Sequence, residues 1–321
     1  MGLAAGLRAF IICPQMSSPA TRAAPPSRLL LVAAFAAIYI IWGSTYLAIR
    51  VAIDTIPPFL MAGARFLIAG ALLYGWARAR GAQRPTGSTW RSATVLGALF
   101  LLLGNGGVVW AEQRVPSGIA AVLVALLPIW TAIIEWIRPP GKRPGAWVTA
   151  GLVTGFAGVA LLLAPGVGTG AQVDLVGGAA LIFASLSWAY AGIISKELPL
   201  PASAAQSSGM QMLAGGLLLT VAGLVTGEFA RAELSAVSLR SAGAFVYLIV
   251  FGSLIGFSAF AWLLRVTTPG RVATYAYVNP IVAVFLGWLI LGEPLATRDL
   301  IAAAIIVGGV VLITTARLRS Q

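Results

Sequence analysis

Long runs of apolar residues alternate with short segments rich in proline, glycine and charge along most of this chain. Most runs are bounded by Pro, Gly or charged residues, as expected at helix ends. Each run has about 20 residues, the length at which an α-helix crosses ~30 Å of hydrocarbon. The pattern predicts an all-α integral membrane protein with ten transmembrane helices, near 29–49, 58–77, 92–111, 117–137, 145–164, 174–195, 204–226, 240–264, 269–291 and 296–316.

The composition agrees with a chain whose solvent is the lipid bilayer. Apolar residues make up 59% of the 321 residues, charged residues make up 9%, and the mean hydropathy is +0.94. A soluble domain carries about a quarter of its residues as charges, so this chain cannot cover a water-facing exterior. The net charge of +12 comes from Arg and Lys that lie mainly between the apolar runs. Membrane topology accounts for that pattern, and we expect no nucleic-acid partner.

The distribution of Lys and Arg between the two sides of the predicted spans gives an orientation. With the N-terminus inside, fifteen of these residues fall on the inner side and five on the outer side, while Arg65 lies within a span. This excess predicts that both termini are cytoplasmic. The five outer residues are Arg50, Arg114, Arg231, Arg240 and Arg298.

The two ends of the chain differ from the apolar runs. The apolar stretch at 3–12 is about half the length needed to span a bilayer. It is not followed by the small-residue site at which a signal peptide or a lipoprotein at Cys13 would be cleaved. We therefore interpret residues 1–28 as a cytoplasmic tail, with Met16 as an alternative start, and residues 317–321 as a second cytoplasmic tail.

The chain also contains a weak internal repeat. Residues 42–50 align with residues 188–196, and the same offset places Arg65 over Gln211. The glycine-rich connector at 163–175 separates two halves of five predicted spans each. Because five is an odd number, the two halves must be inverted relative to each other, an architecture that recurs in secondary transporters.

Several motifs in both halves resemble a known family. The first half contains IIWGSTYLAIRVAID, PPFLMAGARFLIAGALL and GNGGVVWAEQRVPSGIAAVLVALLPIWTAIIEW, and the second contains TPGRVATYAYVNPIVAVFLGWLILGEPL. These stretches resemble the EamA domain of the drug/metabolite transporter superfamily. The resemblance covers roughly residues 29–316 and implies two EamA repeats, at 29–164 and 174–316, around a central substrate cavity. It further implies a cavity lined mainly by spans 1, 3, 4, 6, 8 and 9, and the WAEQ–VPSG stretch resembles bacterial inner-membrane exporters of amino acids or metabolites.

Charged and polar residues inside the spans are the first candidates for a binding site. Arg65 would cost ~2.5–3.5 kcal/mol to insert, so it should face the protein interior. It either binds a substrate carboxylate, or contacts a gate, or braces the structure against carbonyls or Asp54. Asn105 and Glu112 lie two turns apart on one face of span 3. With Trp110 they form a polar end at which Glu112 carries a proton or contacts a substrate amine, unless it is an exposed interfacial carboxylate.

Aromatic residues and prolines give the remaining candidates. A cavity wall and an interfacial belt are both open interpretations for the aromatic residues of spans 1 and 6. Pro128 and Pro280 each remove a backbone donor within a span, which favours a hinge, a binding site or a packing kink. The candidate residues in these groups are Trp42, Thr45, Tyr46, Trp188, Tyr190, Tyr275 and Asn279.

The same sequence argues against several other functions. It has no histidine, a single cysteine and no phosphate-binding loop, so we expect no catalytic triad, no metal or other cofactor and no ATP-driven transport. A membrane-embedded enzyme and a channel are the alternatives, but we see no paired mid-membrane acids and no ring of charges. The sequence therefore predicts a transporter, not an enzyme, that exports amino acids or similar small amphipathic metabolites by alternating access. Protons or a counter-substrate would supply the energy.

Overall fold

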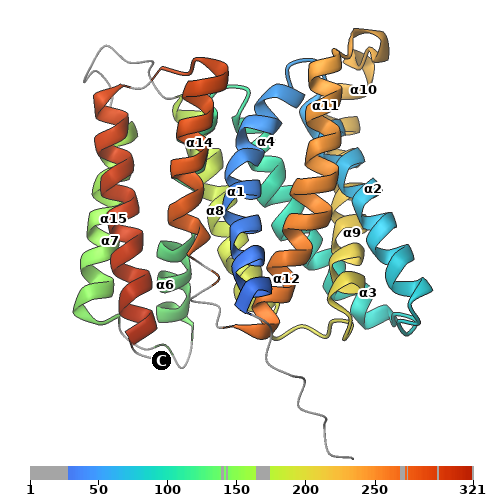
Figure 1. The fold of residues 1–321 in the computed structure, drawn as a ribbon, viewed down its shortest axis with the longest axis horizontal. Helices are drawn as coiled ribbons and strands as arrows, with labels where there is room; N and C mark the ends of the chain where they lie inside the picture. The colour runs from blue at the N-terminus through green and yellow to red at the C-terminus, as the bar shows by residue number, and fades with distance from the viewer. Residues whose placement is uncertain are drawn as a thin grey trace, which may run out of the picture.

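The computed structural model describes residues 28–138, 141, 144–163, 174–267, 272, 274–294 and 296–319. Within these residues the fold is all-helical, as the sequence predicts, and the helices stand side by side in one bundle (Figure 1). The N-terminal tail to residue 27, with Cys13 and Met16, lies outside the described residues.

The first half of the chain forms five apolar helical segments in sequence order. The third is built from three consecutive helices, and the fourth is interrupted by a turn at 125–126. In order, the helices are α1 (Arg28–Ala52), α2 (Pro58–Ala79), α3 (Gly87–Gly97), the π-helix η1 (Ala98–Asn105), α4 (Gly106–Ala111), α5 (Ser117–Val124), α6 (Leu127–Ile137) and α7 (Ala146–Leu163).

The second half repeats this order of five segments. Two short helices, α10 and η2, lie in the connection between its second and third segments. In order, the helices are α8 (Leu175–Ile194), α9 (Ala204–Val225), α10 (Glu228–Arg231), the 3-10 helix η2 (Leu234–Ala236), α11 (Leu239–Tyr247), the π-helix η3 (Leu248–Ile255), α12 (Gly256–Val266), α14 (Tyr275–Leu291) and α15 (Thr297–Arg319).

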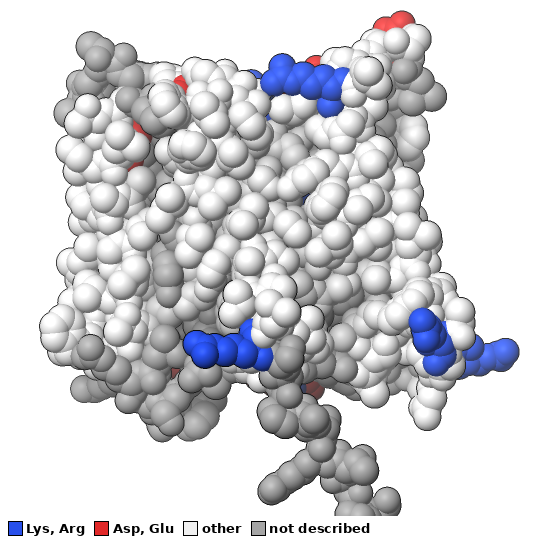
Figure 2. Space-filling model, viewed as in Figure 1, with Lys and Arg blue, Asp and Glu red and all other residues white. Residues whose placement is uncertain are grey.

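Nine segments of the described chain are long and apolar enough to cross a membrane, and a tenth, at Val278–Leu291 within α14, is shorter. Because α1 begins and α15 ends at the same side of the bundle, we call that side the lower end and the opposite side the upper end (Figure 1). Figure 2 shows that the charged side chains on this face gather at the two ends, with uncharged atoms between them. An apolar belt between two charged rims is the surface expected of a protein embedded in lipid.

Corresponding spans of the two halves pack against each other in opposite directions. In the pair α2 and α9, Gly63 lies against Thr220 whereas Gly70 lies against Leu213. The residue number rises along one helix as it falls along the other, so the two helices are antiparallel. The pair α7 and α15 follows the same rule. These antiparallel pairs lie on opposite sides of the bundle (Figure 1) and give the two inverted repeats that the odd number of spans predicts.

Close backbone contact explains the glycines in these pairs. A Cβ atom on Gly70 would lie 2.8 Å from the amide nitrogen of Leu213, and one on Gly309 would lie 2.7 Å from that of Gly155. Small residues allow such approach between helices in a membrane, where packing and not the hydrophobic effect drives association.

The two π-helices occupy matching positions in the third span of each half. Each has eight residues, at Ala98–Asn105 and at Leu248–Ile255. Segments of π-helix inside α-helices are rare and are found frequently at functional sites. Their occurrence at matching positions favours a functional site between spans 3 and 8.

Two glutamates cap helices that begin after a proline. Glu228 accepts the amide N–H groups of Phe59 (3.2 Å) and Leu60 (2.9 Å) at the start of α2. Glu293 accepts those of Ser117 (2.9 Å) and Gly118 (3.2 Å) at the start of α5. A carboxylate at a helix N-terminus satisfies amides that have no partner within the helix and interacts favourably with the helix dipole.

Candidate functional site

A cavity of about 80 Å³ lies at the centre of the bundle, between the two halves. Seven of the ten spans contribute to its wall, the predicted six together with span 2. At ~10–15 Å³ per water position, the cavity has room for a handful of water molecules or a small chemical group. The lining residues are Trp42, Thr45, Tyr46, Ile49, Arg65, Phe66, Asn105, Val108, Val124, Leu127, Trp188, Gly252, Phe257, Tyr275 and Asn279.

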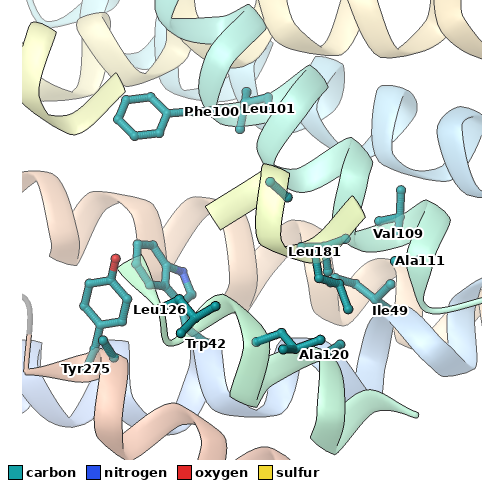
Figure 3. Packing of buried hydrophobic residues seen from close by; sticks show 14 of the residues in the cluster. Trp42, Ile49, Phe100, Leu101, Val109, Ala111, Ala120, Leu126, Leu181 and Tyr275 are labelled. Carbon is teal, nitrogen blue, oxygen red and sulfur yellow. The ribbon is translucent and has the colours of Figure 1, made fainter. Parts of the chain in front are cut away.

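Aromatic rings form one wall of the cavity around Trp42. The Trp42 ring meets Tyr275 edge-on at 5.2 Å between centroids, Phe257 at 6.0 Å and Trp188 at 6.3 Å. Figure 3 shows Trp42 and Tyr275 side by side within the buried cluster. The Trp42 indole Nε1 donates a hydrogen bond to the carbonyl oxygen of Gly252 at 3.3 Å. Edge-to-face contacts and this hydrogen bond hold the indole in one orientation.

Arg65 places a cation beside this wall. Its side chain is buried, with 4% of the residue exposed, and its Nε donates to the Ser253 hydroxyl at 2.8 Å. Its guanidinium carbon lies 4.7 Å from the centre of the Phe66 ring. Among the described residues, Nη1 is buried without a hydrogen-bond partner. A buried donor that lacks a partner costs about 1–3 kcal/mol, more for a charged group, so this nitrogen is suited to an acceptor on a ligand.

The backbone at Gly252 makes room for that guanidinium. A Cβ atom at this position would lie 2.9 Å from Arg65 Nη2 and 3.1 Å from Thr45 Cγ2. Glycine in η3 therefore allows two residues of the first half, Trp42 through its indole and Arg65 through its guanidinium, to lie against the backbone of the second half.

Asn105, Asn279 and Thr45 also contribute polar groups to the cavity wall. Asn105, the last residue of η1, has a buried Oδ1 with no hydrogen-bond partner among the described residues. One terminal atom of the Asn279 amide lies 3.2 Å from the carbonyl oxygen of Tyr275 and 3.1 Å from that of Tyr39. Because carbonyl oxygens accept, we assign this atom as the amide nitrogen, which donates to both. Thr45 donates to the carbonyl oxygen of Trp42 at 2.6 Å. Asn105 Oδ1 is thus suited to accept a hydrogen bond from a ligand.

Three predicted site residues lie outside the cavity lining. Tyr190 is 42% exposed on the surface of α8. Trp110 packs against the core, with the Arg114 guanidinium 4.2 Å above its ring. Glu112 lies one residue beyond the end of α4 at the upper end of the bundle, and it is 0% exposed.

The predicted hinge prolines occupy different positions in their spans. Pro128 is the second residue of α6, one residue after the turn that separates α6 from α5. Pro280 lies inside α14, where it removes the amide that would bond the carbonyl four residues earlier.

Glu112 belongs to a group of polar residues at the upper end that we call the upper cluster: Arg50, Glu112, Ser117 and Glu293. Arg50 Nη1 donates to the backbone carbonyl oxygen of Glu112 at 2.6 Å. Both carboxyl oxygens of Glu112 and the Ser117 hydroxyl are buried without a hydrogen-bond partner among the described residues. Glu112 is outside span 3, which ends at Ala111. Its pKa is raised by burial and by the nearby charge of Glu293, and Arg50 opposes this shift.

Sequence reasoning named no site residue in span 8, although the resemblance implied that this span lines the cavity. Gly252 accepts from Trp42, Ser253 accepts from Arg65, and Phe257 packs against Trp42. The neighbouring Gly and Ser in the middle of an apolar run were the available signal, because a hydroxyl in mid-membrane needs a partner inside the protein. No group of three or more metal-binding side chains occurs within the part of the chain that the structure describes.

Comparison with known proteins places this architecture in one family. The chain matches the EamA-like transporter family over residues 29–164 and again over 175–315. A solved structure titled "Crystal structure of protein" has the same fold, with a TM-score of 0.62 and 22% sequence identity over 92% of this chain and 100% of that chain.

The curated relatives span nearly the whole chain. The uncharacterized inner membrane transporter YedA of Escherichia coli (strain K12) is 39% identical over 89% of this chain and 91% of its own length. The uncharacterized transporter YvbV of Bacillus subtilis (strain 168) is 26% identical over 91% of this chain and 93% of its own length. The all-helical fold, the inverted halves and these matches together show that the chain belongs to the EamA-like transporter family and is a multi-pass membrane transporter.

Proposed function

We propose that this protein is a secondary-active transporter that exports amino acids or similar small amphipathic metabolites by alternating access. The observation that carries the proposal is the cavity between the two inverted halves, where a buried cation with a free donor lies beside an aromatic wall. A site at the interface of inverted repeats is the general position of substrate in secondary transporters.

Arg65 selects for a negatively charged group. A guanidinium binds a carboxylate through two parallel hydrogen bonds, and such charge-assisted bonds are about twice as strong as neutral ones. Nε is occupied by Ser253, whereas Nη1 is buried and has no hydrogen-bond partner within the described part of the chain. A carboxylate oxygen at Nη1 would satisfy this donor and neutralise the cation inside the bundle.

The other cavity walls select for the rest of an amphipathic molecule. The Asn105 Oδ1 atom offers an acceptor to an ammonium, amide or hydroxyl group. The rings around Trp42 offer an apolar surface with defined shape. A carboxylate, a hydrogen-bond donor and an apolar part are the three features that an amino acid combines.

The conformational change would act on the contacts that cross between the two halves. Trp42 and Arg65 of the first half bond to Gly252 and Ser253 of the second. Rocking of the halves would break these bonds and open the cavity to one end, with the π-helices and the positions of Pro128 and Pro280 as hinge points. We place the lower end in the cytoplasm, because Lys and Arg are in excess on the side of both termini.

The test is transport by purified protein in liposomes, with a screen of labelled amino acids and with Arg65→Gln as the variant. Loss of one or two charge-assisted hydrogen bonds, at ~1.5–3 kcal/mol each, raises the apparent KM about tenfold or more. The exposed Arg84→Gln is the matched control and should transport like the wild type.

Two results would contradict the proposal. Saturable transport that is unchanged in Arg65→Gln would remove the carboxylate site from the mechanism. A leak of small ions that does not saturate would indicate a channel in place of alternating access.

A further inference from the structure

The upper cluster contains an ionisable group that the substrate cavity does not use. Glu112 is 0% exposed, and neither of its carboxyl oxygens has a hydrogen-bond partner among the described residues. The Ser117 hydroxyl, also 0% exposed, is likewise without a partner there. An ionised carboxylate that is buried and unpaired is so costly that the neutral, protonated form is favoured.

The charges around Glu112 do not compensate for its burial. On α1, Arg50 is hydrogen-bonded to the backbone carbonyl oxygen of Glu112, not to its carboxyl group. After α14, Glu293 brings a second carboxyl group near it, whose oxygens accept two amide N–H groups of α5. Two neighbouring carboxyl groups disfavour ionisation of the one that lacks hydrogen bonds.

The other charged groups on the segment of Glu112, and on the elements that pack against α4, have partners of their own. On its own segment, Arg114 stacks on Trp110. The carboxylate of Asp174, which begins α8, caps the amide of Gly177. On α2, Arg65 lies in the cavity and is bonded to Ser253. The segment η1, which packs against α4, has no ionisable side chain.

Tyr46 connects this group with the substrate cavity. Its side chain lines the cavity, and it is close enough to Glu112 for the charge of the carboxylate to act on it. Glu112 therefore lies near the wall of the binding site.

We propose that Glu112 is the proton-binding group of this transporter, protonated while the upper end is closed and ionised when that end opens. The inference rests on the proposed alternating access. The proton leaves the Glu112 carboxyl group for water at the upper end on opening and returns from that water on closing, so no other reactant is needed.

The sign of the pH dependence follows from this assignment. The closed state binds one proton more than the open state, because only the open state hydrates the carboxylate. Closure is fully favoured at low pH and is lost as the pH rises through the pKa of Glu112 in the closed state. One proton per opening event changes the open fraction about tenfold per pH unit while the closed state dominates.

The first measurement detects the proton itself and needs no substrate. Infrared spectra of the purified protein in lipid should contain the C=O band of a protonated carboxyl group at neutral pH. That band should be lost in Glu112→Gln and kept in Asp54→Asn, a matched control whose carboxylate lies exposed after α1 at the same end. A spectrum in which Glu112→Gln removes no such band overturns the proposal.

The second measurement detects closure. In a Cys13→Ser background, Ser117→Cys is labelled with a membrane-impermeant maleimide from the upper side. The labelling rate is divided at each pH by the rate for the denatured protein, which removes the pH dependence of thiol ionisation. This ratio should rise about tenfold per pH unit, and Glu112→Gln should abolish the rise, while Asp54→Asn should retain it. Val115→Cys, at a second buried position, repeats the test in case Ser117→Cys does not fold.

The two measurements separate the inference from the proposed function. If the labelling ratio does not change with pH in the protein that keeps Glu112, the inference is overturned, even if amino acids are transported. Labelling and infrared results as expected, in a protein that moves no amino acid, would support the proton site and contradict the proposed substrate class.

Discussion

Replacement of Gly252 by alanine should move the Arg65 guanidinium while leaving the stability of the fold nearly unchanged. The added Cβ would lie 2.9 Å from Arg65 Nη2, whereas ordinary contacts begin at 3.4 Å. The atom that must move is the end of a flexible side chain, not the backbone. We therefore expect the guanidinium to move by ~0.5 Å. A displacement of about this size is the largest that a preorganised binding site accommodates without loss of function.

The energetic consequence falls on binding and not on folding. A shift of this size stretches the 2.8 Å bond from Arg65 Nε to Ser253 and misaligns Nη1 with the substrate carboxylate. Loss of ~1–2 kcal/mol of charge-assisted bonding raises the apparent KM roughly 5- to 30-fold. The helix gains up to ~1 kcal/mol because alanine replaces glycine, so the melting temperature should change little.

The matched control lies in the same span. A Cβ atom added to Gly243 of α11 would have no other atom within 4 Å, so Gly243→Ala should leave both transport and melting temperature close to those of the wild type. Transport is measured in liposomes with a labelled amino acid that the wild type moves saturably, and stability is measured by thermal unfolding in detergent.

Two results would refute this reasoning. A Gly252→Ala protein with an unchanged KM would show that the guanidinium does not contact the substrate. An equal rise in KM for an amino-acid amide, which has no carboxylate, would show that the methyl group obstructs the cavity in general.

Two further predictions concern stability. Glu293→Gln should lower the free energy of unfolding by about 1–2 kcal/mol, because the neutral glutamine side chain loses one of the two bonds to amide N–H groups and the interaction with the helix dipole. Glu228→Gln, at the start of α2, should have a similar effect. Denaturant titration in detergent measures both. Gly309→Ala should cost about 1–3 kcal/mol, because its Cβ would lie 2.7 Å from backbone atoms of α7. The neighbouring Gly308→Ala, with open space around its Cβ, should cost nothing, and equal thermal stability of the two variants would contradict the packing argument.

The fold could be predicted from the sequence because lipid imposes strong rules. Each span must be a helix with about 20 apolar residues, and an odd number of spans in each repeat forces the inversion. Arg65 could also be found, since a cation within an apolar run must face the interior. The structure places it in the cavity wall.

The rest of the site depends on contacts that the local sequence does not encode. Trp188 and Tyr190 are two residues apart on one apolar helix, yet the first lines the cavity and the second is exposed. The π-helices arise inside apolar runs whose pattern is that of ordinary α-helix. The proximity of Glu112 and Glu293 arises because span 9 packs beside the consecutive spans 3 and 4, from which it is distant in sequence.

The repeat supplies a symmetric frame, whereas the chemistry is asymmetric. Each antiparallel pair takes one helix from each half, and each half has one π-helix. The position that holds Arg65 in the first half, however, holds the neutral Gln211 in the second. Gln211 bonds within its own helix, to Ser207, whereas Arg65 reaches across to Ser253 of the other half. A ligand that binds Arg65 therefore acts on a contact between the halves, and this contact must change when one half moves against the other. For this reason we expect substitutions at the Arg65–η3 contact to alter both affinity and the rate of conformational exchange.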